Sequence, residues 1–430
     1  MADTHSADPV SAAPVSAAPV TADLDSRYSW FRLAISLAIA TIGGIGLWSI
    51  VVVLPVLQAE FQVARGAASL PYTISMLGLA IGGVFMGRLA DRSSIVAPII
   101  VGAIALGVGY VAAAYSTSLW MFAAIQGGII GMFGTSATFG PLVADISHWF
   151  LKRRGLAVAI CASGNYLSGT IWPPVISHFV STVGWRQTYI GIGAFCVVTM
   201  IPLALLLRRP SPKQATINAA GISSDPGAAK LQALGISAGT LQAVLVVAGL
   251  ACCVAMSMPQ VHIVAYCADL GFGPARGAEM LSVMLGLGIV SRITSGWLSD
   301  RIGGVKTLLI GSVMQGLTLL LYVPFNGLMS LYVVSALFGL AQGGIVPSYA
   351  LIVREYFPAK EAGTRVGLVL MSTIVGMALG GWLSGLIYDV TGSYQAAFFH
   401  GLAWNVLNAA IGVWLLTRGR RAGNKMTSAA

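Results

Sequence analysis

Long apolar stretches recur along the whole chain and constrain its fold more than any other feature. About 20 helical residues cross a hydrocarbon core about 30 Å thick. Of the 430 residues, 57% are hydrophobic and 9% charged, and the mean hydropathy is +0.83, which excludes a water-soluble globular domain. The stretches are too long for the strands of a transmembrane barrel. They predict an all-α polytopic membrane protein with twelve spans, near 31–57, 70–90, 95–115, 119–143, 154–178, 187–207, 240–268, 278–298, 305–325, 329–353, 364–388 and 396–417.

Basic residues are distributed unevenly between the two sides of the predicted bundle. All but four of the 24 Lys and Arg residues fall in the terminal regions or in every second link between spans. Arg65, Arg186 and Arg276 fall in the other links, and Arg292 lies inside a span. Because positive charge accumulates on the cytoplasmic side, we expect both termini in the cytoplasm and the chain in the inner (cytoplasmic) membrane. This pattern explains the net charge of +10 without a nucleic-acid partner.

The chain divides into two similar halves. Residues 208–239 form the only long polar connection between spans. GRLADR at 87–92 recurs as GWLSDR at 296–301, and a similar offset of about 208 residues separates Gly184 from Gly392 in related links, which indicates a parallel repeat. The predicted units are a disordered cytoplasmic tail 1–27, a six-helix bundle 28–209, a cytoplasmic linker 210–239, a second six-helix bundle 240–417 and a cytoplasmic tail 418–430.

The short links carry motifs with a family likeness. Gly87, Leu89, Ala90, Asp91 and Arg92 match a signature of the major facilitator superfamily, which the chain resembles over roughly residues 30–418. The resemblance implies two pseudo-symmetric six-helix bundles, and it implies that these charges, with their counterparts Asp300 and Arg301, latch the halves together in one state. The residues alone are equally explained as helix-end and topology charges.

A second motif narrows the likeness to one branch. Residues 148–157, HWFLKRRGLA, and the small residues that follow closely resemble a signature of the monocarboxylate transporters. The first-span signature of that branch survives only as Gly43-Gly44-Ile45-Gly46, with Ile42 in place of its acid. The branch implies a small carboxylate as substrate and no cofactor. Five cysteines with no metal-ligand or disulfide spacing predict no metal site and are interpreted as small core residues.

Arg292 is the only fully charged residue well inside a predicted span. A bare Arg there costs about 2.5–3.5 kcal/mol, so it must face protein, water or an anion. The residues leave two interpretations open: Arg292 reaches the cytoplasmic interface or Asp300, or it binds the carboxylate of a substrate. The resemblance implies the second, because the monocarboxylate branch has its substrate-binding arginine at this position. The acid that mammalian members carry one turn earlier is Gly288 here.

Several uncharged side chains are further candidates for the substrate cavity. His262 is the one histidine within a span, and it is interpreted either as a proton-carrying or substrate-binding group or as a hydrogen-bonded core histidine. The other candidates are Thr138, Asn165, Tyr166 and Tyr349, each of which is also explained as a packing residue. Spans five and ten line the cavity in this fold, which favours Asn165 and Tyr349.

The predicted function is secondary transport of small monocarboxylates by alternating access, coupled to protons, by a protein that is not an enzyme and acts as a monomer in the lipid bilayer. Coupling is the less supported part, because Gly288 and Leu57-Gln58 stand where mammalian members carry a coupling Asp and Lys. A carboxylate exchanger of the oxalate:formate type is one alternative, although residues 366–387 lack the basic residue of that group. A membrane sensor or enzyme would need an output domain or clustered ionisable residues within the spans.

Overall fold

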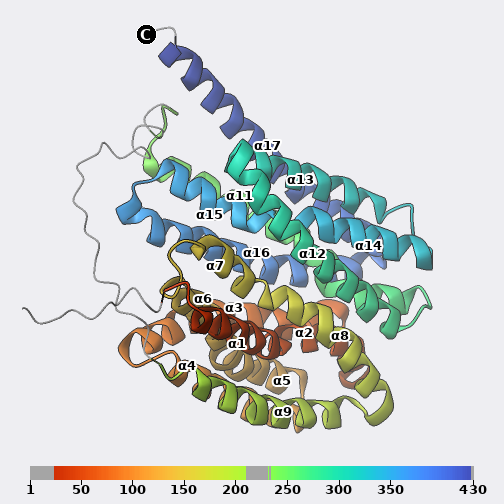
Figure 1. The fold of residues 1–430 in the computed structure, drawn as a ribbon. Coiled ribbons are helices and arrows are strands. Elements are labelled where there is room, and N and C mark those ends of the chain that lie inside the picture. Colours follow the sequence, from red (N-terminus) through yellow and green to blue (C-terminus); the bar gives the residue numbers. More distant parts are fainter. Residues whose placement is uncertain (1–23, 210–230, 232–233, 428–430) are drawn as a thin grey trace, which may run out of the picture.

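The computed structural model describes residues 24–209, 231 and 234–427, and within them the chain forms helices and no strand (Figure 1). The helices of the first half are α1 (Arg27–Gly43), α2 (Ile45–Phe61), α3 (Arg65–Arg92), α4 (Val96–Ala114), α5 (Leu119–Ile125), η2 (Gln126–Gly134), η3 (Thr135–Thr138), α6 (Gly140–Ser147), α7 (Arg154–Ala162), α8 (Gly164–Val183) and α9 (Trp185–Leu206). Those of the second half are α11 (Ala238–Asp269), α12 (Pro274–Ile302), α13 (Gly304–Leu321), α14 (Leu328–Gln342), α15 (Ile345–Tyr356), α16 (Ala359–Thr391) and α17 (Tyr394–Thr427).

Eleven segments among the described residues are long and apolar enough to cross a membrane. All twelve expected spans overlap helices, which confirms the all-α polytopic fold. The span expected at 154–178 is formed by α7 and α8 and is not one of the eleven, because α8 carries Asn165, His178 and two prolines. This less apolar helix packs against α12, which carries Arg292.

The first half (α1–α9) and the second half (α11–α17) lie one above the other in Figure 1. Contacts between them are made by α3 with α16, α8 with α12 and α2 with α11. All five cysteines are buried and unpaired, as their positions in apolar segments predicted.

Described structure is present next to both expected tails. Asp25 accepts hydrogen bonds from the backbone N–H groups of Leu151 (3.2 Å) and Lys152 (3.0 Å), which hold its pKa below the ordinary value although burial alone would raise it. Ser26 then caps α1, which begins at Arg27. At the other terminus α17 continues to Thr427 instead of ending near 417. Residues 1–23 and most of the expected linker lie outside the described residues.

The two ends of the helix bundle differ in how closely the halves approach. We call the end at which α3 joins α4 and α15 joins α16 the basic end, on the left in Figure 1, and the other the far end. The sequence places Arg88 and Arg92 at the first of these joints, and Lys152 and Arg301 in links that the same side of the bundle carries. At the far end a Cβ on Gly385 of α16 would lie 2.9 Å from the backbone of Arg65 on α3. Nearer the basic end, no described atom lies within 4 Å of a Cβ placed at positions 83 and 87 of α3 or 363 and 367 of α16.

The same divergence occurs between α8 and α12. A Cβ on Gly169 of α8 would overlap Leu285 of α12, whereas a Cβ on Gly155 of α7 or Gly296 of α12, nearer the basic end, has no described neighbour within 4 Å. The α3–α16 pair therefore touches at the far end and the α8–α12 pair near its middle, and neither pair has such a contact at the glycines nearer the basic end.

Within the first half, α3 and the η2 segment approach so closely that their contact requires glycine. A Cβ on Gly82 would overlap the carbonyl oxygen of Met132, and one on Gly78 would overlap that of Gly127. The η2 segment has π-helical hydrogen bonding, and it contains Gly127, Gly128, Gly131 and Gly134. Small residues allow this backbone-to-backbone packing, which supplies much of the attraction between helices in a membrane.

We therefore predict that Gly82→Ala destabilises the protein whereas Gly83→Ala does not. The first substitution forces α3 away from η2, at a cost of about 1–3 kcal/mol. The neighbouring position is open, so alanine there is neutral or slightly stabilising through its helix propensity. The measurement is the apparent melting temperature of the detergent-solubilised protein. Equal melting temperatures for the two variants would contradict the close packing described here.

Candidate functional site

Arg292 lies on α12, half-buried, and its guanidinium points to the first half of the chain. Nη1 donates to the carbonyl oxygen of Ala162 (3.0 Å) at the end of α7, and Nε donates to that of Gly343 (3.5 Å) between α14 and α15. Among the described residues it makes no ion pair. The cationic group is thus held by neutral carbonyl oxygens, without a carboxylate partner among the described residues.

The ring of Tyr166 on α8 packs against this guanidinium. Its ring centroid lies 4.3 Å from Cζ of Arg292, a cation–π contact between the two halves. The ring lies directly against Gly288, where any Cβ would overlap Cε1 of the tyrosine. Only glycine at 288 admits the ring. The space beside Gly288, where the resemblance to the monocarboxylate transporters would place an acidic side chain, is therefore filled by the ring of Tyr166 from the first half.

Asn165 lies next to Tyr166 at the start of α8 and is also half-buried. Its backbone carbonyl oxygen accepts a hydrogen bond from Nε1 of Trp48 (3.1 Å). Its side-chain amide has no hydrogen bond within the described part of the chain. Asn165 and Tyr166 thus come from one helix turn beside Arg292, with the amide of Asn165 available for a ligand.

Two other expected cavity residues are used for helix packing. Thr138 is buried, donates to the carbonyl oxygen of Thr135 (2.8 Å) and lies against Gly43 of α1. Tyr349 is fully buried on α15, where its hydroxyl lies 2.9 Å from the carbonyl oxygen of Ala248 and 2.7 Å from Oδ1 of Asn408. Neither side chain has a hydrogen bond with Arg292. Their spacing in the sequence could not distinguish a cavity-facing from a helix-facing direction.

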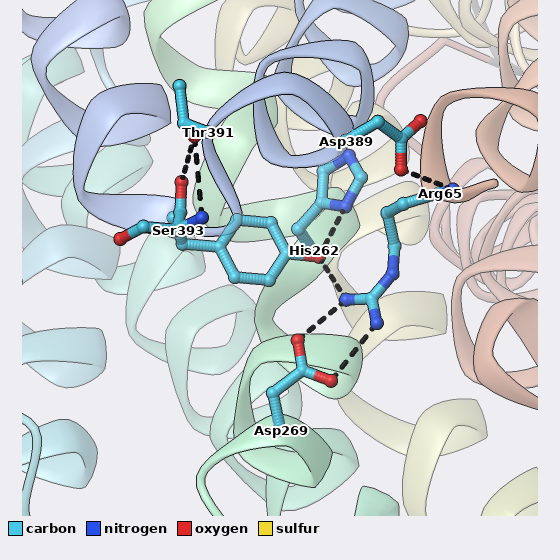
Figure 2. A network of polar contacts seen from close by, with 7 residues as sticks. Arg65, His262, Asp269, Asp389, Thr391 and Ser393 are labelled. Carbon is cyan, nitrogen blue, oxygen red and sulfur yellow. Dashed lines mark hydrogen bonds and ion pairs between the residues drawn. The ribbon is translucent and has the colours of Figure 1, made fainter.

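His262 belongs to a second polar cluster at the far end, shown in Figure 2. It is fully buried on α11, with Nε2 2.7 Å from the carbonyl oxygen of Gly381 and Nδ1 3.0 Å from the hydroxyl of Tyr394. A carbonyl oxygen only accepts, so Nε2 carries the proton and Nδ1 accepts from the tyrosine. Both ring nitrogens are engaged by protein groups, and His262 has no hydrogen bond with Arg292.

Arg65 is the centre of that cluster. Its guanidinium donates two hydrogen bonds to Asp269 (2.8 and 3.0 Å) and a third to the hydroxyl of Tyr394 (2.6 Å). The backbone N–H groups of Arg65 and Gly66 both donate to Asp389 at 2.7 Å. These bonds join α3 of the first half to α11, α16 and α17 of the second. We call Arg65, His262, Asp269, Asp389 and Tyr394 the Arg65 latch.

The Arg65 latch was not predicted from the sequence, where Arg65 was interpreted only as a basic residue in a link on the non-cytoplasmic side. One signal was available: Arg65 is one of only three basic residues in the far-end links, and the acids Asp269 and Asp389 end the spans that face it. A second buried arginine, Arg32, was also not predicted to form an ion pair. Arg32 of α1 is 1% exposed, pairs with Asp145 of α6 (2.8 Å) and lies over the ring of Trp149 (4.6 Å).

The expected latch charges at the basic end are apart in this structure. Asp91, Arg92, Asp300 and Arg301 are exposed, and no ion pair joins them within the described ranges. Arg301 instead lies over the ring of Trp297, with its Cζ 3.8 Å from the centroid. Their gating role stays a prediction, and their separation agrees with the parting of the helices at this end.

The two clusters differ in what they can do chemically. The Arg65 latch is closed: its guanidinium is neutralised by a carboxylate. The Arg292 cluster combines an unneutralised guanidinium, an aromatic face and a neighbouring amide, a set suited to a small organic anion. In the described residues no group of three or more His, Cys, Asp or Glu could hold a metal ion.

Comparisons with known proteins give the chain a family context. A sequence profile described as Major Facilitator Superfamily matches residues 35–295 and, separately, residues 245–428. Monocarboxylate transporter 13 of Rattus norvegicus is 28% identical over 345 residues, which cover 79% of this chain and 77% of that protein. Monocarboxylate transporter 11 of Homo sapiens is 27% identical over 395 residues, which cover 87% of this chain and 80% of that protein.

A solved structure shares the fold. The nucleoside transporter NupG superposes with a TM-score of 0.69 at 15% identity, covering 89% of this chain and 99% of that one. At this identity the likeness concerns the helix arrangement alone.

The contact between Tyr166 and Arg292 yields a prediction on which part of the tyrosine matters. Tyr166→Leu removes the aromatic face and costs about 0.5–2 kcal/mol through the lost cation–π contact, in addition to lost packing. Tyr166→Phe keeps the ring and should leave stability near that of the parent. Apparent melting temperatures of the purified variants provide the comparison. If phenylalanine proves as damaging as leucine, the hydroxyl and not the ring supports Arg292.

Proposed function

Since the chain belongs to the major facilitator superfamily, we propose that it is a secondary transporter of small monocarboxylates in which Arg292 anchors the substrate carboxylate. The observation that carries this proposal is the guanidinium of Arg292, half-buried in a membrane span and held by carbonyl oxygens and an aromatic ring without a carboxylate. The two relatives named above are described as monocarboxylate transporters, which supports the same substrate class.

The energetics favour an anion at this position. A carboxylate that meets the guanidinium forms charge-assisted hydrogen bonds, two of them if the approach is bidentate. Hydrogen bonds that involve a charged group contribute about 1.5–3 kcal/mol each, and a carboxylate adds an attraction between opposite charges that a neutral carbonyl oxygen lacks. The ring of Tyr166 lies against the guanidinium and Asn165 precedes it in α8, and we propose that both contact the rest of a small organic acid. The arrangement fits a single carboxylate better than two, because no second cation accompanies Arg292 among its described contacts.

We propose that transport proceeds by alternating access of the two halves. The far end is held by the Arg65 latch while α3 and α16, and α8 and α12, part toward the basic end. In the opposite state Asp91, Arg92, Asp300 and Arg301 would pair across the basic end and the Arg65 latch would open. The substrate at Arg292 would then face each side in turn.

Two modes of coupling fit this site. Proton symport is our first proposal, and it rests on the resemblance to the monocarboxylate branch. Carboxylate exchange is the second, and one observation favours it: the described contacts of Arg292 are carbonyl oxygens and Tyr166, with no carboxylate beside it to carry a proton. We also propose that the protein acts as a monomer in the cytoplasmic membrane.

The first test is uptake of labelled monocarboxylates into proteoliposomes, with and without an inward proton gradient. Arg292→Ala should reduce uptake by about 10- to 100-fold, since the lost charge-assisted bonds are worth a few kcal/mol. The matched control is Arg276→Ala on the same helix, because Arg276 is exposed and its ion pair is with Glu279, three residues on in the same helix. Uptake by the Arg292 variant equal to that of the control would remove Arg292 from the site. Absence of uptake for every acid tested would refute the proposed substrate class.

The orientation has a separate test. If both termini are cytoplasmic, a fluorescent protein that folds only in the cytoplasm should be bright when fused after residue 430, and alkaline phosphatase should be inactive there. Insertion of the phosphatase between Ser116 and Ser118, in a far-end link, should give activity. The reverse pattern would invert the topology and place the Arg65 latch on the cytoplasmic side.

A further inference from the structure

The hydrogen bonds of the Arg65 latch have a defined direction that runs from an arginine to a histidine. Nη1 of Arg65 donates to the oxygen of Tyr394, so the single hydroxyl proton of Tyr394 is free to donate to Nδ1 of His262. Nε2 of His262 donates onward to the carbonyl oxygen of Gly381 on α16. The closed latch thus requires His262 to be neutral and protonated at Nε2.

A second proton on His262 has no acceptor of its own in the closed latch. Nδ1–H would point at the Tyr394 oxygen that already accepts from Arg65, and the tyrosine proton would lose its partner. The imidazolium and Nη1 of Arg65 would also lie within about 6 Å of each other, since each is within 3.0 Å of that oxygen. Two cations would therefore be held together in a fully buried position.

The other charged and titratable groups around His262 are already committed. On α11 Asp269 is engaged by the guanidinium of Arg65, and on α16 Asp389 accepts the backbone N–H groups of residues 65 and 66. Tyr388 of α16 lies under the guanidinium of Arg65, 4.5 Å from its Cζ, and Tyr266 of α11 packs edge-on against Tyr394 of α17. Among the described contacts, Asp269, Asp389, Tyr388 and Tyr266 have no hydrogen bond with His262.

We propose that His262 is a proton-binding site that controls the far end: the Arg65 latch closes only around neutral His262, and acid at that end opens it. The inference rests on the alternating access proposed above and adds a regulatory role for a residue that does not touch the substrate anchor. It makes acid on the far side a factor that favours the far-open state, the state in which Arg292 would accept a carboxylate from that side.

The direction and size of the pH effect follow from linkage. The closed latch excludes the protonated histidine, so its stability is present above about pH 6.5, the usual pKa of an exposed histidine, and is lost as the pH falls through that value. Between about pH 7.5 and about pH 5.5, the open-to-closed ratio at the far end should rise about tenfold.

The experiment uses a cysteine that is reached only when α3 and α16 separate. Ser69 is fully buried and lies between Gly66 and Thr73, both of which contact α16. Ser69→Cys, in a chain whose native cysteines are replaced, is labelled with a water-soluble maleimide at the two pH values. The same reporter in a His262→Gln background provides the control, because glutamine keeps a donor and an acceptor but does not titrate, and the thiol chemistry cancels in the ratio of the two rates.

We expect labelling to accelerate about tenfold at the lower pH in the parent relative to His262→Gln. Tyr394→Phe, which removes the hydroxyl between Arg65 and His262, should label rapidly at both pH values. An equal pH response in His262→Gln would show that Asp269 or Asp389 titrates instead and would overturn the proposal, as would a parent that shows no response.

Hydrogen exchange gives the same readout with the native cysteines in place. Peptides covering residues 65–73 and 384–394 should exchange faster at the lower pH in the parent, but not in His262→Gln, once labelling times are scaled for intrinsic exchange. Both measurements need no substrate. A failure to transport carboxylates would therefore refute the proposed function and leave the latch result standing, whereas a pH-insensitive latch would refute only this inference.

Discussion

The cost of burying a guanidinium in a membrane protein organises this structure. An arginine removed from water must find acceptors or an anion, and three arginines here do so in different ways. Arg32 pairs with Asp145 and joins α1 to α6, and Arg65 pairs with Asp269 and joins the two halves at the far end. Arg292 alone of the three has no carboxylate partner among the described residues, and carbonyl oxygens and a tyrosine ring hold it instead. Two of these arginines are thus neutralised by the fold, and the third keeps its charge where the halves meet.

The contacts between the halves explain why this difference has functional meaning. Helices α3 and α16 are joined at the far end by the bonds of Arg65 and Gly66 to Asp389, and they part toward the basic end. Tyr166 of the first half touches Arg292 of the second, so the proposed anion anchor lies at the interface between the halves. In the proposed mechanism, a movement of one half relative to the other changes the contact between Tyr166 and Arg292. Binding at Arg292 would in this way depend on the conformation of the protein.

The sequence identified Arg292 as a lone charge inside a span, but it did not show which residues surround it. A lone charge on a small-residue helix face is visible in the sequence, because helical periodicity places Gly288 one turn before Arg292. That an aromatic ring from α8 fills the space over Gly288 depends on how two helices from different halves cross, and no local pattern encodes that. The same limit applies to Thr138 and Tyr349, whose polar groups bond within the helix packing, and to His262, whose partners come from α16 and α17.

The sequence by itself determined the all-α membrane fold, the succession of spans and the family, because hydropathy and short link motifs are local properties that the bilayer imposes on each segment separately. It also singled out Arg292, since an ionised residue inside a span is costly wherever its helix packs. Only the tertiary structure decided which arginines are neutralised, which end of the bundle is closed and where His262 belongs. Those outcomes depend on side chains that are 113 to 329 residues apart in sequence, such as Arg32 and Asp145 or Arg65 and Tyr394, and their partnership exists only once the helices have packed.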